Sequence, residues 1–143
     1  MKAINIKKKK SYLGICVARK NSKGLKNKNI VSINSKPCSF WTLSAAKNSK
    51  KLSKVILSTD SKKIISIAKS LDIEVPYERP KYLSGDNSPI YKTIHHLLKY
   101  YKKKKIFFNY IVLLQCSSPF RTSKHIDSAI KHFEKNKKKN FHH

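Results

Sequence analysis

The 143-residue chain is long enough for one domain with a sizeable core, and 39% of its residues are hydrophobic and 28% charged. No apolar run approaches the roughly 20 residues of a membrane span, so we expect a soluble domain without a membrane partner. Three cysteines without C-x-x-C spacing and six histidines without an H-E-x-x-H motif argue against a zinc or dithiol centre, and free thiols favour a cytoplasmic location.

The formal net charge of +26 is the feature that suggests a nucleic-acid partner. Only three of the 33 basic residues are arginines, however, and the lysines are scattered along the whole chain. Arginine grips phosphate in two-point geometry, whereas lysine acts as a point charge. We therefore interpret the excess as a solvated surface with nonspecific attraction to polyanions at low salt, and keep a basic nucleic-acid-binding module as the alternative.

Hydrophobic periodicity predicts strands and helices in alternation. The expected strands are 13–18, 55–57, 73–75 and 107–114, with a short extended piece at 30–33. The expected helices are 38–49, 90–101 and 124–135. A further helix, which Asp60 or Ser61 caps, ends near Leu71. The strand at 107–114 is hydrophobic almost throughout, as a central parallel strand should be. This order predicts a three-layer α/β domain with a mainly parallel sheet over 13–135, between a basic lead-in at 1–12 and a disordered tail at 136–143.

The first strand leads into a loop that is rich in lysine and asparagine, at 19–29. A buried strand that feeds a basic, amide-rich loop is typical of the start of an α/β nucleotide site. The N–H groups and cations of such a loop face a polyphosphate. The loop has neither a G-x-G-x-x-G motif nor a G-x-x-x-x-G-K-[ST] motif, and an ordinary solvated loop is the alternative interpretation.

The same loop resembles a family signature. Its sequence from Ala18 to Asn29, A-R-K-N-S-K-G-L-K-N-K-N, is similar to the A-R-x-x-S-K-G-x-x-x-K-N signature of the acylneuraminate cytidylyltransferases, the CMP-sialic acid synthetases. The similarity continues in order through S-T-D at 58–60, R-P at 79–80, Asp86, and L-Q-C-S-S-P-F-R-T at 114–122, where the family has L-Q-P-T-S-P-L-R-T. Several spaced motifs in the right order are far more specific than any one of them.

The resemblance implies a Rossmann-like fold and a reaction. A sugar-acid hydroxyl attacks the α-phosphorus of CTP, and pyrophosphate leaves. The acceptor is N-acetylneuraminate or a related nonulosonate such as legionaminate. The related 3-deoxy-octulosonate enzymes are the alternative, but they carry an acidic residue just after the glutamine where this chain has Cys116. The family implies a homodimer of full-length chains.

Eight residues are the expected CTP-binding set: Arg19, Ser22, Lys28, Asn29, Arg79, Asn87, Ser88 and Gln115. The resemblance makes Arg19 and Lys28 the phosphate ligands, because both lie on the first loop and match family positions. Ser22 and Asn29 match as well, and a hydroxyl and an amide there can contact phosphate or ribose.

Two residues beyond the first loop have competing interpretations. Arg79 can reach the nucleotide, or it can form a surface ion pair with Glu78 or Glu74, which contributes little. Asp60 ends a strand and can help hold a metal, but we favour a helix cap.

We expect the cytosine base to contact Gln115, Asn87 and Ser88. Gln115 emerges at a strand's carboxyl end, and its carboxamide can satisfy the donor and acceptor edge of cytosine; a backbone hydrogen bond at the strand end is the alternative. Asn87 and Ser88 occupy the polar position where the family contacts the base.

Trp41 lies on a helical apolar stripe, so we expect it in the core or at an interface and away from the nucleotide.

The resemblance implies Mg²⁺ as cofactor, but the seven acidic residues contain no D-x-D-like pair to hold it. Family members are considerably longer, and their second half carries that pair, much of the sugar pocket and the dimer segment. We therefore expect the chain to be the incomplete nucleotide-binding half, either a fragment or a truncated product, and inactive by itself. No catalytic residue and no metal ligand is assigned.

Overall fold

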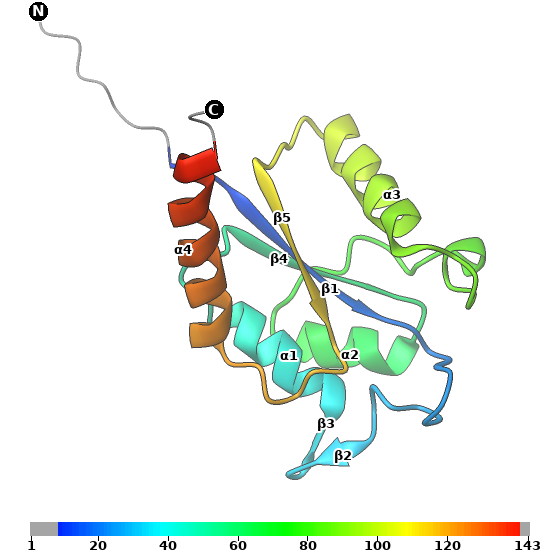
Figure 1. Ribbon diagram of the computed structural model, residues 1–143. Coiled ribbons are helices and arrows are strands. Elements are labelled where there is room, and N and C mark those ends of the chain that lie inside the picture. The colour runs from blue at the N-terminus through cyan, green and yellow to red at the C-terminus, as the bar shows by residue number, and fades with distance from the viewer. Residues whose placement is uncertain (1–8, 141–143) are drawn as a thin grey trace, which may run out of the picture.

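Strand β1, Tyr12–Ala18, is the axis of the fold, because all seven of its residues are buried. Strands β4, Lys54–Thr59, and β5, Tyr110–Gln115, pair with it in parallel on either side, which gives the order β4-β1-β5 (Figure 1). The computed structural model describes residues 9–140, the last three by their backbone alone. The expected three-layer α/β fold with a parallel sheet is confirmed.

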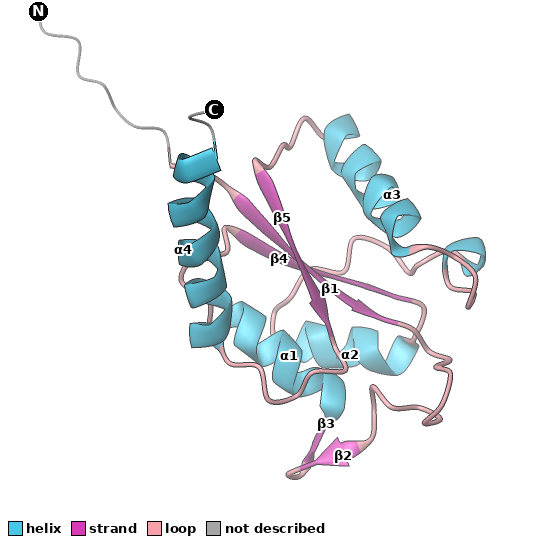
Figure 2. Ribbon diagram, in the orientation of Figure 1, coloured by secondary structure: helices cyan, strands magenta, loops and turns pink. Residues whose placement is uncertain are grey.

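The other elements connect and cover these strands. They are β2 Ser32–Ile33, β3 Lys36–Pro37, α1 Cys38–Lys47, α2 Lys62–Ser70, the 3₁₀ helix η1 Lys81–Leu83, α3 Ile90–Lys103 and α4 Ser123–Asn140. Helices α1, α2 and α4 lie on one face of the sheet and α3 lies on the other (Figure 2). Within residues 9–140, no helix is long and apolar enough to cross a membrane.

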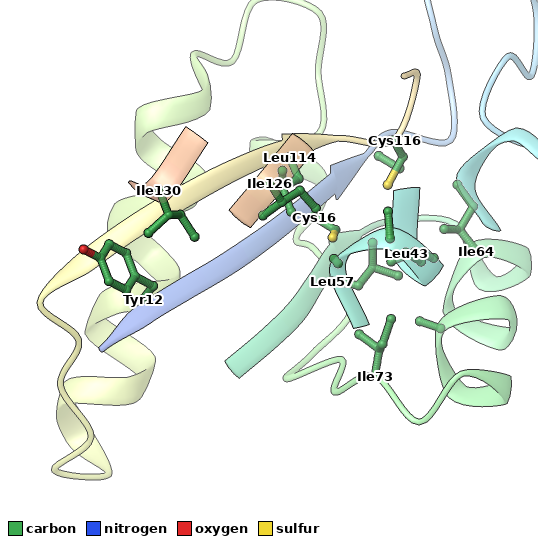
Figure 3. Close-up of a cluster of buried hydrophobic side chains, with 14 residues drawn as sticks. Tyr12, Cys16, Leu43, Leu57, Ile64, Ile73, Leu114, Cys116, Ile126 and Ile130 are labelled. Atoms are coloured by element: carbon green, nitrogen blue, oxygen red, sulfur yellow. The ribbon is translucent and has the colours of Figure 1, made fainter. Parts of the chain in front are cut away.

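The larger core cluster lies on the face that the three helices cover. It joins Leu43 of α1, Ile64 of α2 and Ile126 of α4 to Cys16 and Leu57 of the sheet (Figure 3). Burying each of the aliphatic side chains stabilises the fold by about 1.5–3 kcal/mol. On the opposite face a smaller cluster packs Leu97 and Tyr101 of α3 against β1 and β4. The core therefore holds the sheet rigidly from both faces.

Helix α2 begins at Ser61, whose Oγ accepts a hydrogen bond from the Ile64 N–H at 3.4 Å. The preferred interpretation of Asp60 as a cap is therefore wrong. The Asp60 Oδ1 instead accepts the Lys20 N–H at 2.7 Å, and this bond ties the loop after β1 to the end of β4.

Two strand predictions need correction. The expected strand at 73–75 is reduced to a single bridge between Glu74 and Ile56, because the left-handed Asp72 (φ 56°) and Pro76, which lacks an N–H, bound it closely. The expected central strand at 107–114 begins only at Tyr110 and lies at the edge of the described sheet.

The expected ends of the domain also shift. Helix α4 continues to Asn140, so the predicted disordered tail is helical over 136–140, while 141–143 lie outside the described residues. Strand β1 begins at Tyr12, one residue before the expected domain start, and 1–8 of the predicted lead-in lie outside the described residues.

Candidate functional site

A cavity of about 240 Å³ opens at the carboxyl ends of β1 and β5. Parallel pairing brings these two ends to the same edge of the sheet. The walls of the cavity come from the strand ends, from the loop 19–29 and from the segment 79–93. Open α/β sheets bind their ligands at this edge.

The cavity gathers seven of the eight predicted site residues. They are Arg19, Ser22, Lys28, Asn29, Arg79, Ser88 and Gln115. Asn87 is exposed and does not line the cavity. Residues that are up to 96 positions apart in the sequence thus share one small space.

Arg79 is the most unusual of the seven, because only 4% of it is exposed. Its Nε donates to Ser58 Oγ at 3.0 Å and its Nη2 donates to the Ser58 carbonyl oxygen at 2.6 Å. The predicted alternative, an ion pair with Glu78 or Glu74, is not formed; Glu74 pairs with Lys54 instead. Burial lowers the pKa of Arg79 below its usual value, and the Asp60 carboxylate offsets part of that effect.

A guanidinium stays protonated even when its pKa falls, because the ordinary value is so high. Arg79 therefore carries a buried positive charge, and no carboxylate within residues 9–137 forms an ion pair with it. A buried cation with no ion-pair partner is costly, and the more distant Asp60 carboxylate offsets only part of that cost. The cavity offers space in which an anion can bind beside Arg79.

Arg19 contributes a second, more exposed guanidinium. Its Nη1 lies 2.8 Å from Asp86 Oδ1, and the two side chains are 32% and 47% exposed. A pair this exposed contributes about 0–1 kcal/mol, so an anionic ligand can displace Asp86 at small cost. Lys28 adds a third cation that forms no ion pair within the described residues.

The loop that carries these cations is held by its own polar groups. The Asn29 Nδ2 donates to the Arg19 carbonyl oxygen at 3.2 Å, and the Ser22 Oγ donates to the Leu25 carbonyl oxygen at 2.7 Å. The turn also needs left-handed residues, which Gly24 (φ 86°) and Asn27 (φ 56°) supply. The hydroxyl of Ser22 and the amide of Asn29 thus already shape the loop, and both residues line the cavity.

Gln115 ends β5 with its backbone and side chain in different roles. Its carbonyl oxygen accepts hydrogen bonds from Arg121 Nη1 at 3.3 Å and from Thr42 Oγ1 at 3.5 Å. Its side-chain carboxamide has no hydrogen-bond partner among the described residues, and Gln115 lines the cavity. The alternative in which the side chain bonds to backbone at the strand end is therefore not observed.

The motif analysis missed two polar residues of the cavity, Thr93 and Ser117. Thr93 lies four residues before Leu97 on the buried stripe of α3, so helical spacing could have revealed it. Ser117 lies in the turn after β5, inside the matched motif at 114–122, and only the cavity distinguishes it from its neighbour Ser118.

The residues described do not fit the expected Mg²⁺ site. No group of three or more His, Cys, Asp or Glu residues in 9–137 is arranged to hold a metal ion. Asp86 is the only carboxylate among the described residues that line the cavity, and Arg19 already pairs with it. A second cavity of about 480 Å³ shares Arg19 and Asn29 and is lined by two carboxylates, Asp60 and Glu78, of which Asp60 already accepts the Lys20 N–H.

A family model described as cytidylyltransferase matches residues 13–143. The chain belongs to the cytidylyltransferase family. The resemblance that the spaced motifs predicted is confirmed, and the cavity lies among those motifs.

Relatives of this cytidylyltransferase chain include enzymes named for different sugar acids. It is 38% identical over 122 residues to an N-acylneuraminate cytidylyltransferase from Escherichia coli O18:K1:H7, a match that covers 85% of this chain and 28% of the relative. It is 35% identical over 118 residues to a CMP-N,N'-diacetyllegionaminic acid synthase from Legionella pneumophila, covering 82% of this chain and 51% of the relative. The chain therefore spans about half or less of the length of these relatives.

Solved structures support the fold. A CMP:2-keto-3-deoxy-manno-octonic acid synthetase complexed with CTP superposes with a TM-score of 0.69 at 14% identity, over 87% of this chain and 48% of that one. A cytidylyltransferase from Leptospira borgpetersenii gives 0.62 at 23% identity, over 90% and 50%. At these identities the likeness establishes a shared architecture.

Proposed function

We propose that this chain carries the CTP-binding part of an enzyme that transfers CMP from CTP to a nonulosonic sugar acid. In this reaction a sugar hydroxyl oxygen bonds to the α-phosphorus, the bond from that phosphorus to the β-phosphate oxygen breaks, and pyrophosphate leaves. The hydroxyl proton passes to solvent water in the same exchange. Negative charge grows on the leaving group, so the site must present cations to it.

The buried charge of Arg79 is the observation that carries this proposal. Together with Arg19 and Lys28 it makes the cavity cationic on the side of the first loop, where the triphosphate would bind. The free carboxamide of Gln115 and the hydroxyl of Ser88 supply neutral hydrogen-bonding groups for the cytosine.

The relatives support a nonulosonate as acceptor. Those at 38% and 35% identity are named for N-acylneuraminate and diacetyllegionaminic acid. The octulosonate synthetase is related at the level of the fold, and Cys116 and Ser117 stand directly after Gln115 where an acidic residue would favour that substrate. We therefore favour neuraminate and legionaminate over octulosonate.

Three expectations for the whole protein remain part of the proposal. A homodimer is what the resemblance implies for full-length chains. A cytoplasmic location agrees with Cys16, Cys38 and Cys116, all of which are free thiols. Mg²⁺ stays an expectation of the resemblance, because the described residues place a single carboxylate, Asp86, on the cavity and Arg19 already pairs with it.

Nucleotide binding tests the proposal. Calorimetric titration with CTP, UTP, ATP and GTP at low and high salt should show a preference for CTP that persists at high salt. The alternative, a basic nucleic-acid-binding module, predicts similar affinity for any polyanion and a steep loss of binding with added salt. Equal binding of all four nucleotides, lost at high salt, would refute the proposal.

Turnover by residues 1–143 should be negligible, because the described residues lack the carboxylate pair that the reaction is expected to need. The assay is pyrophosphate release from CTP with N-acetylneuraminate and Mg²⁺, on protein that circular dichroism shows to be folded. Robust turnover would mean that Asp86 or Asp60 leaves its present partner to hold the metal.

A further inference from the structure

The second cavity, of about 480 Å³, adjoins the first, because Arg19 and Asn29 line both. Its other walls include Lys20, which follows β1, and the residues 60–64, which join β4 to α2. Parallel pairing of β1 and β4 brings their carboxyl ends to the edge of the sheet where α/β domains bind ligands. The two cavities therefore share one edge of the sheet and one guanidinium.

Positive side chains outnumber negative ones in the lining of the second cavity. The cations are Arg19, Lys20, Lys62 and Lys63. None of the three lysines forms an ion pair within the described residues. Of the two carboxylates, Asp60 already accepts the Lys20 N–H at 2.7 Å, and Glu78 is exposed. This balance favours a ligand that carries several negative charges.

The same lining argues against two other classes of ligand. A metal ion needs a cluster of ligating side chains, and no group of three or more His, Cys, Asp or Glu residues in 9–137 is arranged to hold one. A nonulosonic acid carries a single carboxylate, which one or two of the cations would satisfy. A diphosphate concentrates several charges in a small group, and lysines bind phosphate oxygens as point charges.

We infer that the second cavity is a binding site for inorganic pyrophosphate, the group that leaves CTP in the proposed reaction, with Lys62 and Lys63 as its main ligands. This inference rests on the proposed function and deepens it, because it gives the released product a site of its own beside the CTP cavity. Neither lysine lines the first cavity, so their charges are directed to the second cavity alone.

Arg19 connects the two cavities. Its Nη1 lies 2.8 Å from Asp86 Oδ1, and the pair is exposed enough to be weak, so the guanidinium can exchange the carboxylate for a phosphate. The bond from Asp60 to the next N–H, that of Lys20, holds the backbone in place while the side chain moves. One cation can therefore stay in contact with the diphosphate as it passes from one cavity to the other.

Calorimetric titration at physiological ionic strength tests the inference with pyrophosphate as the probe. Saturating the chain with CTP fills the first cavity, so pyrophosphate that still binds reports the second. Lys62→Gln/Lys63→Gln removes two charges from this cavity, and the Kd for pyrophosphate should rise roughly 3- to 10-fold, as expected for two exposed charge contacts. In separate titrations, the Kd values of the free chain for CTP and for N-acetylneuraminate should not change.

Lys23→Gln/Lys26→Gln is the matched control, because both lysines lie on the loop 19–29, are exposed and line neither cavity. It removes the same charge and should leave the Kd for pyrophosphate unchanged. Lys20→Ala is a second, independent variant of the cavity and should weaken pyrophosphate but not CTP, because Lys20 lines the second cavity and not the first. Circular dichroism checks that each variant is folded.

Four results would overturn the inference. Pyrophosphate might fail to bind the CTP-saturated chain, or bind Lys62→Gln/Lys63→Gln as tightly as wild type. Equal weakening by the control variant would make general positive charge responsible. Equal weakening of CTP and pyrophosphate by Lys62→Gln/Lys63→Gln would mean that the cavity holds the phosphates of bound CTP, and weaker binding of N-acetylneuraminate would assign it to the acceptor. The proposed function survives each of these results, and fails instead if the wild-type chain does not prefer CTP to other nucleotides.

Discussion

The two walls of the cavity are built in opposite ways. The loop 19–29 is tied down before any ligand arrives, by Asn29 to the Arg19 carbonyl and by Asp60 to the Lys20 N–H. The wall at 83–93 presents Ser88 and Thr93 with their hydroxyls unpaired among the described residues. One wall is held by internal hydrogen bonds, and the other leaves two buried hydroxyls unpaired among the described residues.

This difference follows from what each wall has to hold. Cations that converge on one space repel one another, so a scaffold must fix them in place, and preorganised charge costs no rearrangement when the ligand binds. Neutral hydroxyls do not repel, and leaving them unpaired costs about 1–3 kcal/mol each in the free protein. The loop 19–29 is therefore fixed by its own hydrogen bonds, while the wall at 83–93 keeps two hydroxyls unpaired among the described residues.

Arg79→Ala should give the largest effect, because it removes the buried positive charge that lines the cavity. We expect CTP affinity to fall by about 2–5 kcal/mol. Arg79→Lys keeps the charge but not the fork that grips Ser58, so it should recover only part of the loss. Calorimetry measures both variants, and unchanged affinity in Arg79→Ala would show that the buried charge serves the fold alone.

Arg19→Ala removes the more exposed guanidinium and should cost about 1.5–3 kcal/mol of CTP binding with the fold intact. Lys20→Ala is its matched control, because Lys20 is the next residue on the loop, is exposed and does not line the cavity. Its backbone bond to Asp60 is also retained. A loss of affinity as large in Lys20→Ala would mean that general positive charge is responsible.

Asp86→Asn should change affinity in the opposite direction. Removing the carboxylate frees Arg19 from its partner, so we expect CTP to bind more tightly by about 0.2–1 kcal/mol when measured without Mg²⁺. Weaker binding in Asp86→Asn would indicate that this carboxylate contacts the nucleotide directly.

Trp41 should report no effect at all. Its Nε1 donates to the Ile33 carbonyl oxygen at 2.9 Å, its ring packs edge-on against Phe40, and it does not line the cavity. Trp41 fluorescence should therefore stay constant on adding CTP. Quenching without a change in the far-ultraviolet spectrum would place the nucleotide near α1 instead.

The amino-acid sequence was sufficient to predict much of the site. A buried strand followed by polar residues marks a strand's carboxyl end, and parallel strands present these ends at one edge. Arg19 and Gln115 could therefore be placed together from sequence patterns alone. Whether the seven residues bind CTP stays a prediction. Thr93 escaped notice because a threonine among apolar residues of a helix has no motif.

Other features depend on tertiary contacts that local patterns do not contain. The hydrophobic run at 107–114 predicted a central strand, but a run of apolar residues cannot specify how many neighbours a strand has, and Ile111 and Leu113 are each 37% exposed. Asp60 and Ser61 were both candidates for a cap, and the bond from Asp60 to Lys20, 40 residues away, decided between them. The segment 136–140, predicted to belong to a disordered tail, instead continues α4, since its lysines are good helix formers.

Backbone amide shifts of ¹⁵N-labelled protein titrated with CTP test the central claim most directly, because they locate the ligand without any substitution. The account predicts changes concentrated on the two walls and the end of β5, around Arg19, Ser88 and Gln115. Small changes spread over the lysine-rich surfaces of α3 and α4, or confined to Lys62 and Lys63 beside the second cavity, would contradict it.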